Sequence, residues 1–326
     1  MTELIRVGIV GTGFAAQKRA EAFTEDDRAQ VVAVAGHRPE SREIFCQTYT
    51  VTGYESPQEL IHNADVDLIV ICHVNAEHGK IAQTALEADK HVVVEYPLAL
   101  QPDQAQYLIT LAKQKNKLLH VEHIELLGGL HNAIRDWLQE IGDVFYARYS
   151  TVNPQRPAPQ KWSYHKQLFG FPFSGALSRF HRFTDLFGQV NAVNCHTRYW
   201  ERENPDEYVA CFNHAQLQFA NGLLADVIYG KGEVFWQPSR SFELHGDRGT
   251  LLFEGSEGKL IRGDEETPIE VGSRRGLFAK DTSYVLDYLT AKQPLYVAVS
   301  SSYYATRVAD AARVAAETGK TIFLDR

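Results

Sequence analysis

Short apolar runs alternate with helical patterns over the first 123 residues, and this alternation restricts the fold more than any other feature. Five runs rich in Val and Ile have the length and composition of buried strands. They lie at residues 6–11, 30–36, 66–72, 90–96 and 117–123. Continuous apolar strands that alternate with helices are typical of a parallel sheet covered on both faces. We therefore predict a doubly wound domain of the Rossmann type over residues 1–123.

The pattern changes after residue 124. Longer segments of alternating polarity follow, at residues 144–152, 193–200, 215–230, 240–255 and 258–263. Turn signals such as Asn221-Gly222 separate them, which favours hairpins in an antiparallel sheet. Helices are expected near 174–187, 277–290 and 300–317. Residues 124–326 are thus predicted to form an α+β domain with a large, mostly antiparallel sheet.

A glycine loop follows the first predicted strand and precedes the first predicted helix. Gly11-Thr12-Gly13-Phe14-Ala15-Ala16 has the pattern G-x-G-x-x-A. The first glycine permits a tight turn, the second lets the backbone approach a pyrophosphate, and the small last residue allows close packing of helix and strand. The helix N-terminus then faces the phosphates. We predict a dinucleotide site to which Gly11, Gly13, Phe14 and Ala15 contribute.

The residues after the second predicted strand indicate which dinucleotide binds. A site for NAD is expected to carry Asp or Glu there, to hold the ribose 2′-hydroxyl. This chain has His37 and Arg38 instead. A guanidinium binds a 2′-phosphate, which a carboxylate would repel. NADPH is therefore the predicted cofactor, with NADH weaker; the alternative is that Arg38 is simply solvated.

Residues 66–100, VDLIVICHVNAEHGKIAQTALEADKHVVVEYPLAL, resemble the glucose-fructose oxidoreductase / inositol dehydrogenase / MocA-like family. Members of that family carry Glu-Lys-Pro where this chain has Glu95-Tyr96-Pro97. The resemblance implies that Tyr96 lies under the edge of the nicotinamide. Its phenol could hydrogen-bond the carboxamide or the substrate, or its ring could stack or simply pack. The remaining cofactor residues that the resemblance implies are Cys72, Val74, Asn75, His78 and Glu95.

The catalytic groups for alcohol oxidation are missing from the matching positions. In the family, the lysine acts with an Asp and a His on a helix of the second domain. The corresponding stretch here is residues 175–188, and it places either Ser178 and Arg182 or Arg179 and Phe183 at those two positions. An alcohol dehydrogenase without all three groups should transfer protons very poorly.

One branch of the family, the biliverdin reductases, carries Glu-Tyr-Pro at this place. The chain resembles the cyanobacterial type in long runs, which include residues 7–21, 92–100, 118–129, 144–151, 169–173, 176–188, 227–235, 244–251 and 271–278. This resemblance implies NADPH-dependent reduction of biliverdin IXα to bilirubin, with hydride added to the central methine carbon. No alcohol is deprotonated in that reaction, so the lysine, Asp and His are unnecessary.

The resemblance and the spacing together suggest which residues meet the substrate. Arg179 and Arg182 are three residues apart on one predicted helix and could face the cleft together. The resemblance points to Arg179 as the important site arginine, near the pyrrole nitrogens. Because the pKa of arginine exceeds about 12, charge stabilisation or an ordered water is preferred over direct proton donation. Tyr96 and Glu125 complete the predicted catalytic set.

The proton source is left open, with protonated Glu125 or His123 as options. The predicted substrate-binding residues are Arg182, His123, Tyr146 and Arg274. Tyr146 lies on a strand whose sheet should form the far wall of the bilin site. Arg274 could bind a propionate or the 2′-phosphate, although a solvated charge is an equal alternative.

Composition sets the remaining expectations. The net charge of −8 disfavours nucleic-acid binding, and the four cysteines lack paired spacing, so neither disulfides nor a metal site is expected. There is no apolar run long enough to span a bilayer and no signal-peptide pattern, so neither export nor membrane anchoring is predicted. The resemblance implies a cytoplasmic protein. A monomer is expected from the resemblance. Two alternatives remain: a polyol or sugar dehydrogenase, and a non-catalytic regulator that senses NADP(H).

Overall fold

The computed structural model describes residues 4–324. The chain divides into two compact units. The first contains the chain up to Ile124 together with Gly276–Tyr303, and the second contains Glu125–Arg275 and the chain from Tyr304 onward. The first unit thus holds a segment that the sequence-based ranges, 1–123 and 124–326, place in the second domain. This segment supplies helix α10 (Leu277–Ala291).

The first unit is built on a parallel sheet of six strands in the order β3-β2-β1-β4-β5-β6, which confirms the predicted fold class. The strands are β1 (Ile5–Val10), β2 (Ala29–Ala35), β3 (Thr52–Tyr54), β4 (Leu68–Ile71), β5 (His91–Val94) and β6 (Leu119–Val121). The five predicted strands are present, and the short edge strand β3 is additional. The strand order reverses between β1 and β4, and ligands of such sheets bind beyond the carboxyl ends of the strands at this point.

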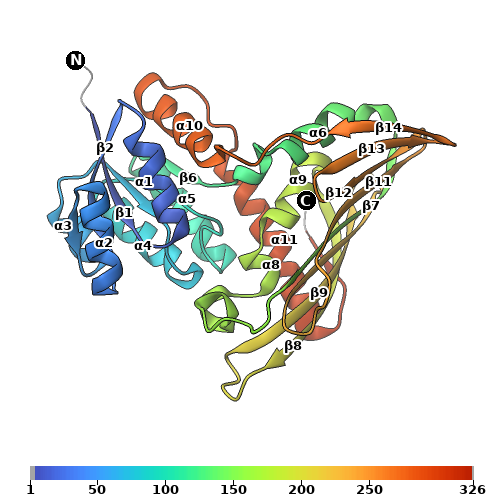
Figure 1. Ribbon diagram of the computed structural model, residues 1–326, viewed down its shortest axis with the longest axis horizontal. Coiled ribbons are helices and arrows are strands. Elements are labelled where there is room, and N and C mark those ends of the chain that lie inside the picture. The colour runs from blue at the N-terminus through green and yellow to red at the C-terminus, as the bar shows by residue number, and fades with distance from the viewer. Residues whose placement is uncertain (1–3, 325–326) are drawn as a thin grey trace. The chain divides into compact units, whose positions relative to one another are not determined.

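Helices cover both faces of this sheet (Figure 1). They are α1 (Phe14–Thr24), α2 (Pro39–Tyr49), α3 (Pro57–Asn63), α4 (Asn75–Glu87), α5 (Pro102–Gln114) and α10. Alternate residues of each strand enter one of two apolar clusters. On β4, Ile69 and Ile71 pack with α3, α4 and α5, whereas Leu68 and Val70 pack with α1 and α10. Burial on both faces explains why these strands are continuously apolar.

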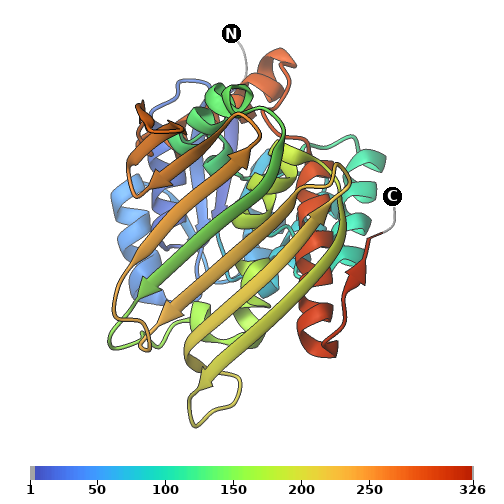
Figure 2. The same cartoon turned by 90° about the vertical axis from the view of Figure 1, so that its right-hand side faces the viewer.

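The second unit contains a sheet of nine strands in the order β14-β13-β12-β11-β7-β10-β9-β8-β15 (Figure 2). The strands are β7 (Val144–Pro154), β8 (Val190–Glu201), β9 (Tyr208–Phe219), β10 (Leu224–Gly232), β11 (Ser239–Gly246), β12 (Gly249–Glu254), β13 (Glu257–Arg262), β14 (Glu265–Glu270) and β15 (Ile322–Phe323). Neighbouring strands are antiparallel, except that β7 and β10 are parallel. This is the large, mostly antiparallel sheet that the sequence predicts.

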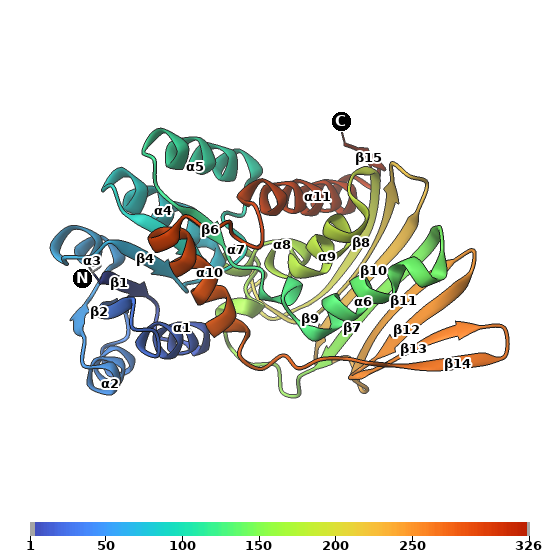
Figure 3. The ribbon, with the colours of Figure 1, turned by 90° about the horizontal axis from the view of Figure 1, so that it is seen from above.

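Helices lie against one face of the large sheet (Figure 3). The helical segments of this unit are α6 (Gly129–Trp137), η2 (Leu138–Ile141), η3 (Trp162–Tyr164), α7 (Lys166–Phe169), α8 (Pro172–Gly175), α9 (Ser178–Phe187) and most of α11 (Val299–Thr318), and a 3-10 turn, η1 (Ile124–Leu126), precedes them. Aromatic contacts fix α9 and α8 on the sheet: Phe183 of α9 lies 5.2 Å from Phe242 of β11, and Phe173 of α8 lies 6.4 Å from Tyr229 of β10, measured between ring centroids. No helix within residues 4–324 is long and apolar enough to cross a membrane.

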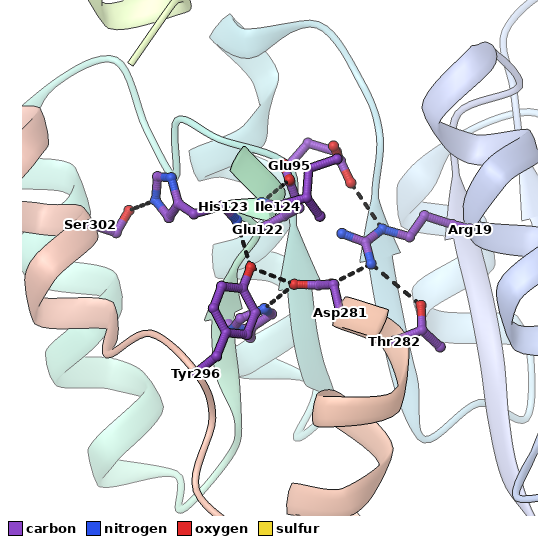
Figure 4. A network of polar contacts seen from close by, with 10 residues as sticks. Arg19, Glu95, Glu122, His123, Ile124, Asp281, Thr282, Tyr296 and Ser302 are labelled. Atoms are coloured by element: carbon purple, nitrogen blue, oxygen red, sulfur yellow. Dashed lines mark hydrogen bonds and ion pairs between the residues drawn. The ribbon is translucent and has the colours of Figure 1, made fainter. Parts of the chain in front are cut away.

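A buried ion pair ties α10 to α1 within the first unit (Figure 4). Arg19 of α1 and Asp281 of α10 are both fully buried. Asp281 Oδ1 also accepts hydrogen bonds from His120 Nε2 at 2.8 Å and from the Tyr296 hydroxyl at 2.7 Å. Burial alone would raise the pKa of Asp281, but the charge of Arg19 and these two donors outweigh it and hold the pKa well below its usual range.

We predict that Asp281→Ala lowers the free energy of unfolding by about 3–5 kcal/mol, because it leaves a buried guanidinium without its main counter-charge. Denaturant-induced unfolding measures the loss. Asp287→Ala is the matched control on the same helix, since Asp287 pairs with Arg28 at 2.5 Å nearer the surface; it should cost only about 0–1 kcal/mol.

The same experiment has a pH dependence. A carboxyl group whose pKa is depressed on folding stabilises the protein above its unfolded pKa and loses that effect as the pH falls through the folded pKa. The stability gap between wild type and Asp281→Ala should therefore narrow below pH 3.8, the ordinary pKa of the group. Equal losses of unfolding free energy in Asp281→Ala and Asp287→Ala at neutral pH would contradict the stabilising role given to the buried pair of Arg19 and Asp281.

Candidate active site

The glycine loop lies at the carboxyl end of β1, as predicted. Gly11 has φ = 122°, and a Cβ there would lie 2.1 Å from the backbone oxygen of Cys72, so only glycine fits. Gly13 precedes the first residue of α1, and a Cβ there would meet no atom of residues 4–324 within 4 Å, its chain neighbours aside. The helix has no side-chain cap and no acidic residue in its first turn among the described residues. Its N–H groups are therefore available to an anion, and the loop fits a dinucleotide pyrophosphate.

The neighbouring loop carries the residues predicted to select the ribose phosphate. His37 and Arg38 follow β2 and are both exposed. No ion pair to Arg38 occurs within residues 4–324. Arg42, one turn further on, instead donates from Nη1 to the Gly36 carbonyl at 2.8 Å. The loop that carries Arg38 approaches the glycine loop, since a Cβ on Gly36 would lie 2.7 Å from Thr12 Cγ2, and no carboxylate among the described residues pairs with Arg38.

The next two strands end in the residues that the family resemblance assigns to the cofactor. Those beyond β4 are Cys72, Val74, Asn75 and His78, and those beyond β5 are Glu95 and Tyr96. His78 is buried, with Nδ1 2.8 Å from the Pro97 carbonyl and Nε2 2.9 Å from the His73 carbonyl. Burial lowers the pKa of His78, and a neutral imidazole donates to one of these carbonyls at a time. His78 therefore links the two loops.

Tyr96 and His123 form an aromatic stack. Their ring centroids are 5.5 Å apart and their planes differ by 2°. His123 Nε2 lies 2.8 Å from the Ser302 hydroxyl oxygen, and the His123 backbone N–H donates to the Tyr296 hydroxyl at 2.9 Å (Figure 4). The structure thus brings one predicted cofactor residue and one predicted substrate residue together.

Two charged residues outside the predicted site, Arg19 and Glu122, contact or adjoin its members in the sequence. Arg19 Nε donates to Glu95 Oε1 at 2.9 Å, which fixes the residue before Tyr96. Glu122 is also buried, and its Oε1 accepts from the Ile124 N–H at 2.5 Å. Burial and the nearby Glu95 raise the pKa of Glu122 well above its usual range, so its neutral form is favoured. Strand β6 ends at Val121, so Glu122 and His123, which fall within the predicted strand 117–123, lie just beyond the observed strand.

In the second unit, α9 presents two arginines to the sheet. Arg179 Nε donates to Thr151 Oγ1 at 2.8 Å, and its guanidinium carbon lies 4.3 Å from the centroid of the Tyr229 ring. Arg182, one turn later, is buried, and its guanidinium carbon lies 5.8 Å from the ring of Tyr149. The predicted pairing of the two arginines on one helix face agrees with these contacts.

Glu125 lies among arginines rather than in an apolar setting. Arg182 Nη2 lies 3.3 Å from Glu125 Oε2, Arg240 Nη2 lies 3.7 Å from the same oxygen, and Arg274 pairs with Oε1. The predicted residues Glu125, Arg182 and Arg274 are therefore together, and Arg240 of β11 joins them. Arg240 was not predicted, because it is a lone arginine at the start of a strand and only the fold shows its neighbours.

Tyr146, a further predicted substrate residue of this unit, lies on the opposite face of the sheet from Tyr149 and Thr151. Side chains alternate along a strand, so Tyr146 of β7 faces away from α9, whereas Tyr149 and Thr151 face toward it. Its hydroxyl donates to Asp226 Oδ2 at 3.0 Å on the other face of the sheet. Burial and this hydrogen bond raise the pKa of Tyr146 to about 12. Among residues 4–324 there is no group of three or more His, Cys, Asp or Glu that could hold a metal.

Comparison with known proteins identifies the class. Residues 5–123 match the oxidoreductase family with an NAD-binding Rossmann fold, GFO/IDH/MocA, and residues 138–324 match the C-terminal alpha/beta domain of the same family. The chain therefore belongs to this oxidoreductase family and is an NAD(P)H-dependent oxidoreductase.

Three relatives narrow the comparison. The crystal structure of biliverdin reductase in complex with biliverdin and NADP+ from Synechocystis sp. PCC 6803 is 56% identical, covers 96% of this chain and 99% of that chain, and superimposes with a TM-score of 0.95. Mouse biliverdin reductase A is 28% identical over 72% of this chain and 70% of its own length. A dTDP-3,4-didehydro-2,6-dideoxy-alpha-D-glucose 3-reductase from Saccharopolyspora spinosa is 33% identical over 78% of this chain and 76% of its own length.

The glycine loop generates a paired prediction. Gly13→Ala should fold like wild type, because a methyl group fits there, yet it should bind a nicotinamide dinucleotide at least tenfold more weakly, because the methyl group stands where the backbone approaches the pyrophosphate. Gly11→Ala should lower the melting temperature as well, since its Cβ collides with backbone. Cofactor fluorescence titration and thermal unfolding separate the two effects. A Gly13→Ala protein with unchanged cofactor affinity would remove this loop from the site.

Proposed function

We propose that this chain is an NADPH-dependent biliverdin reductase, which reduces biliverdin IXα to bilirubin. The observation that carries the proposal is the 56% identity over 96% of the chain to the Synechocystis enzyme, whose structure contains biliverdin and NADP+. The residues agree with that chemistry. Tyr96 stands where the family lysine is expected, and the positions that should hold an Asp and a His hold either Ser178 and Arg182 or Arg179 and Phe183.

The reaction adds a hydride to the central methine carbon of the tetrapyrrole and a proton to a pyrrole-type nitrogen. Bound NADPH supplies the hydride. The cofactor residues are those of the glycine loop (Gly11, Gly13, Phe14, Ala15), the 2′-phosphate loop (His37, Arg38) and the loops after β4 and β5 (Cys72, Val74, Asn75, His78, Glu95, Tyr96). The uncapped helix terminus supports binding of a dinucleotide pyrophosphate, and the exposed Arg38 supports NADPH over NADH.

Arg179 stabilises the charge that develops on the pyrrole nitrogens or holds the water that donates the proton. A guanidinium group does not readily give up a proton at neutral pH, so direct proton donation by Arg179 is not part of the proposal. Its hydrogen bond to Thr151 and its place over the Tyr229 ring restrict the guanidinium to few orientations. Fixed donors of this kind stabilise developing charge without reorganisation.

Tyr96 and His123 act as a pair. The stack restricts the orientation of the phenol, which then borders the nicotinamide or the bilin. Glu95, held by Arg19, fixes the backbone on which Tyr96 stands. His123 remains a candidate proton source, whereas Glu125 is engaged by three guanidinium groups and acts through them. Tyr146 remains the weakest member of the predicted substrate set, because it faces away from α9.

Two other functions are retained as alternatives. The 33% identity to the dTDP-sugar 3-reductase supports reduction of a keto sugar, but the family lysine that would assist the proton transfer is absent. The absence of the family lysine is also compatible with a regulator that binds NADP(H) and catalyses no reaction. The proposal further includes a cytoplasmic monomer that does not bind nucleic acid, in keeping with the net charge of −8.

An absorbance assay tests the proposal. Purified protein, biliverdin IXα and NADPH should convert the red-absorbing biliverdin band into the blue-absorbing bilirubin band. Turnover of a keto sugar without any bilin reduction would favour the sugar reductase. Tight NADPH binding without hydride transfer to either compound would favour the regulator.

Arg179→Lys should lower kcat for biliverdin by about 10²–10³-fold, because a planar, fixed donor is replaced by a flexible point charge. The dissociation constant for NADPH should not change. Arg198→Ala is the matched control: it removes another arginine that lies over an aromatic ring, 4.7 Å from Trp200, but on an exposed part of β8. Equal kcat values for Arg179→Lys and wild type would exclude the proposed role.

Arg38→Ala should reduce the preference for NADPH over NADH by about 10–100-fold, the value of one hydrogen-bonded charge pair with the 2′-phosphate. Dissociation constants for both cofactors measure the ratio. Lys80→Ala, which removes an exposed charge from α4, controls for net charge. An unchanged ratio in Arg38→Ala would mean that Arg38 is only solvated.

A further inference from the structure

Three arginines from three separate elements of the second unit converge on one carboxylate. Arg182 belongs to α9, Arg240 to β11 and Arg274 to the loop that follows β14, and all three pair with Glu125. We call these four residues the arginine cluster. No second carboxylate within residues 4–324 forms an ion pair with any of the three. The cluster therefore carries two positive charges that no acidic partner compensates.

The cluster also has hydrogen-bond donors without acceptors. Arg182 is 1% exposed, and its Nε and Nη1 have no hydrogen-bond partner among residues 4–324. The same holds for Arg240 Nε. Burial lowers the pKa of Arg182, and the neighbouring Arg240 and Arg274 lower it further. Buried polar groups in native proteins are nearly always satisfied, so a buried guanidinium with two open donors indicates a site for an acceptor.

We infer that the arginine cluster is a subsite for a ligand carboxylate, and that Glu125 occupies this subsite until the ligand competes with it. The inference rests on the proposed function, in which the substrate carries two propionate groups. Carboxylates are the anions that match the guanidinium fork. The cluster then selects a dicarboxylic substrate over an uncharged analogue, and Glu125 is the residue that sets the strength of this selection.

Glu125 has a different role here from that of a proton donor. When its carboxylate fills the subsite, it compensates part of the charge of the buried Arg182. A substrate propionate can take its place only by matching those contacts, which an ester cannot do. Removal of an arginine should therefore weaken binding of the diacid without affecting the ester. Removal of the Glu125 charge should tighten binding of the diacid, again without affecting the ester.

The test compares biliverdin IXα with its dimethyl ester, in which both propionates are uncharged, on the NADPH-bound enzyme. Arg240→Ala should raise KM for the diacid about tenfold or more, the value of one charge-assisted hydrogen bond, and leave KM for the ester unchanged. Glu125→Gln should lower KM for the diacid several-fold and leave the ester unchanged. Arg275→Ala is the matched control, since this exposed neighbour of Arg274 forms no ion pair with Glu125.

The outcomes separate this inference from the proposed function. If Arg240→Ala and Glu125→Gln leave the ratio of KM values for diacid and ester as it is in wild type, the subsite is overturned while biliverdin reduction stands. If wild type reduces neither compound, the proposed function fails, and the subsite is then tested with inorganic sulfate by isothermal titration calorimetry. Tighter sulfate binding by Glu125→Gln than by wild type and Arg275→Ala supports it, and equal binding overturns it. Should Glu125→Gln fail to fold, weaker sulfate binding by Arg240→Ala, whose side chain is 32% exposed, supports the subsite and unchanged binding overturns it.

Discussion

The buried guanidinium of Arg19 holds together the parts of the first unit on which the cofactor site depends. It lies on α1, the helix whose N-terminus faces the predicted pyrophosphate, and it pairs with Glu95 beside Tyr96 and with Asp281 on α10. A buried charge is tolerated only where its partners are in place. The position of α10 and the orientation of the loop that carries Tyr96 are therefore fixed by one side chain. Burial and the nearby Glu95 raise the pKa of Glu122, which favours its neutral form beside this cluster.

The second unit depends on the opposite condition, a cluster in which positive charge exceeds negative charge. Arg182 is buried with open donors, and Glu125 is the carboxylate that the three arginines share. The first unit gives one buried cation two carboxylate partners, although Arg19 Nη2 has no hydrogen-bond partner among the described residues. The second unit shares one carboxylate among three cations. The difference in charge balance, rather than an open donor alone, therefore distinguishes the second cluster as a place for a ligand anion.

Periodicity allowed the two fold classes and most strands of both sheets to be predicted, and the glycine pattern placed the loop between β1 and α1, because each follows from local pattern. Strands β3, β14 and β15 escaped prediction. In β3, three residues of which two are exposed leave no apolar signal. The ionic contacts could not be predicted either. Arg19 and Asp281 are 262 residues apart, and Arg240 is a single basic residue in an alternating strand. Tyr146 illustrates a further limit. Alternation shows which residues of a strand share a face, but tertiary packing decides which of the two faces meets the helices.

The exchange of catalytic groups argues for a change of chemistry on a retained scaffold. A sugar dehydrogenase needs a base near the nicotinamide to take up the hydroxyl proton. Here Tyr96 is stacked on His123, and the helix in the second unit presents arginines that cannot act as bases at neutral pH. A conjugated tetrapyrrole requires no base for hydride addition, because the electrons move along the conjugated path to nitrogen. What it requires is positive charge near the nitrogens and propionates, and in the proposed function the two arginines of α9 provide that charge.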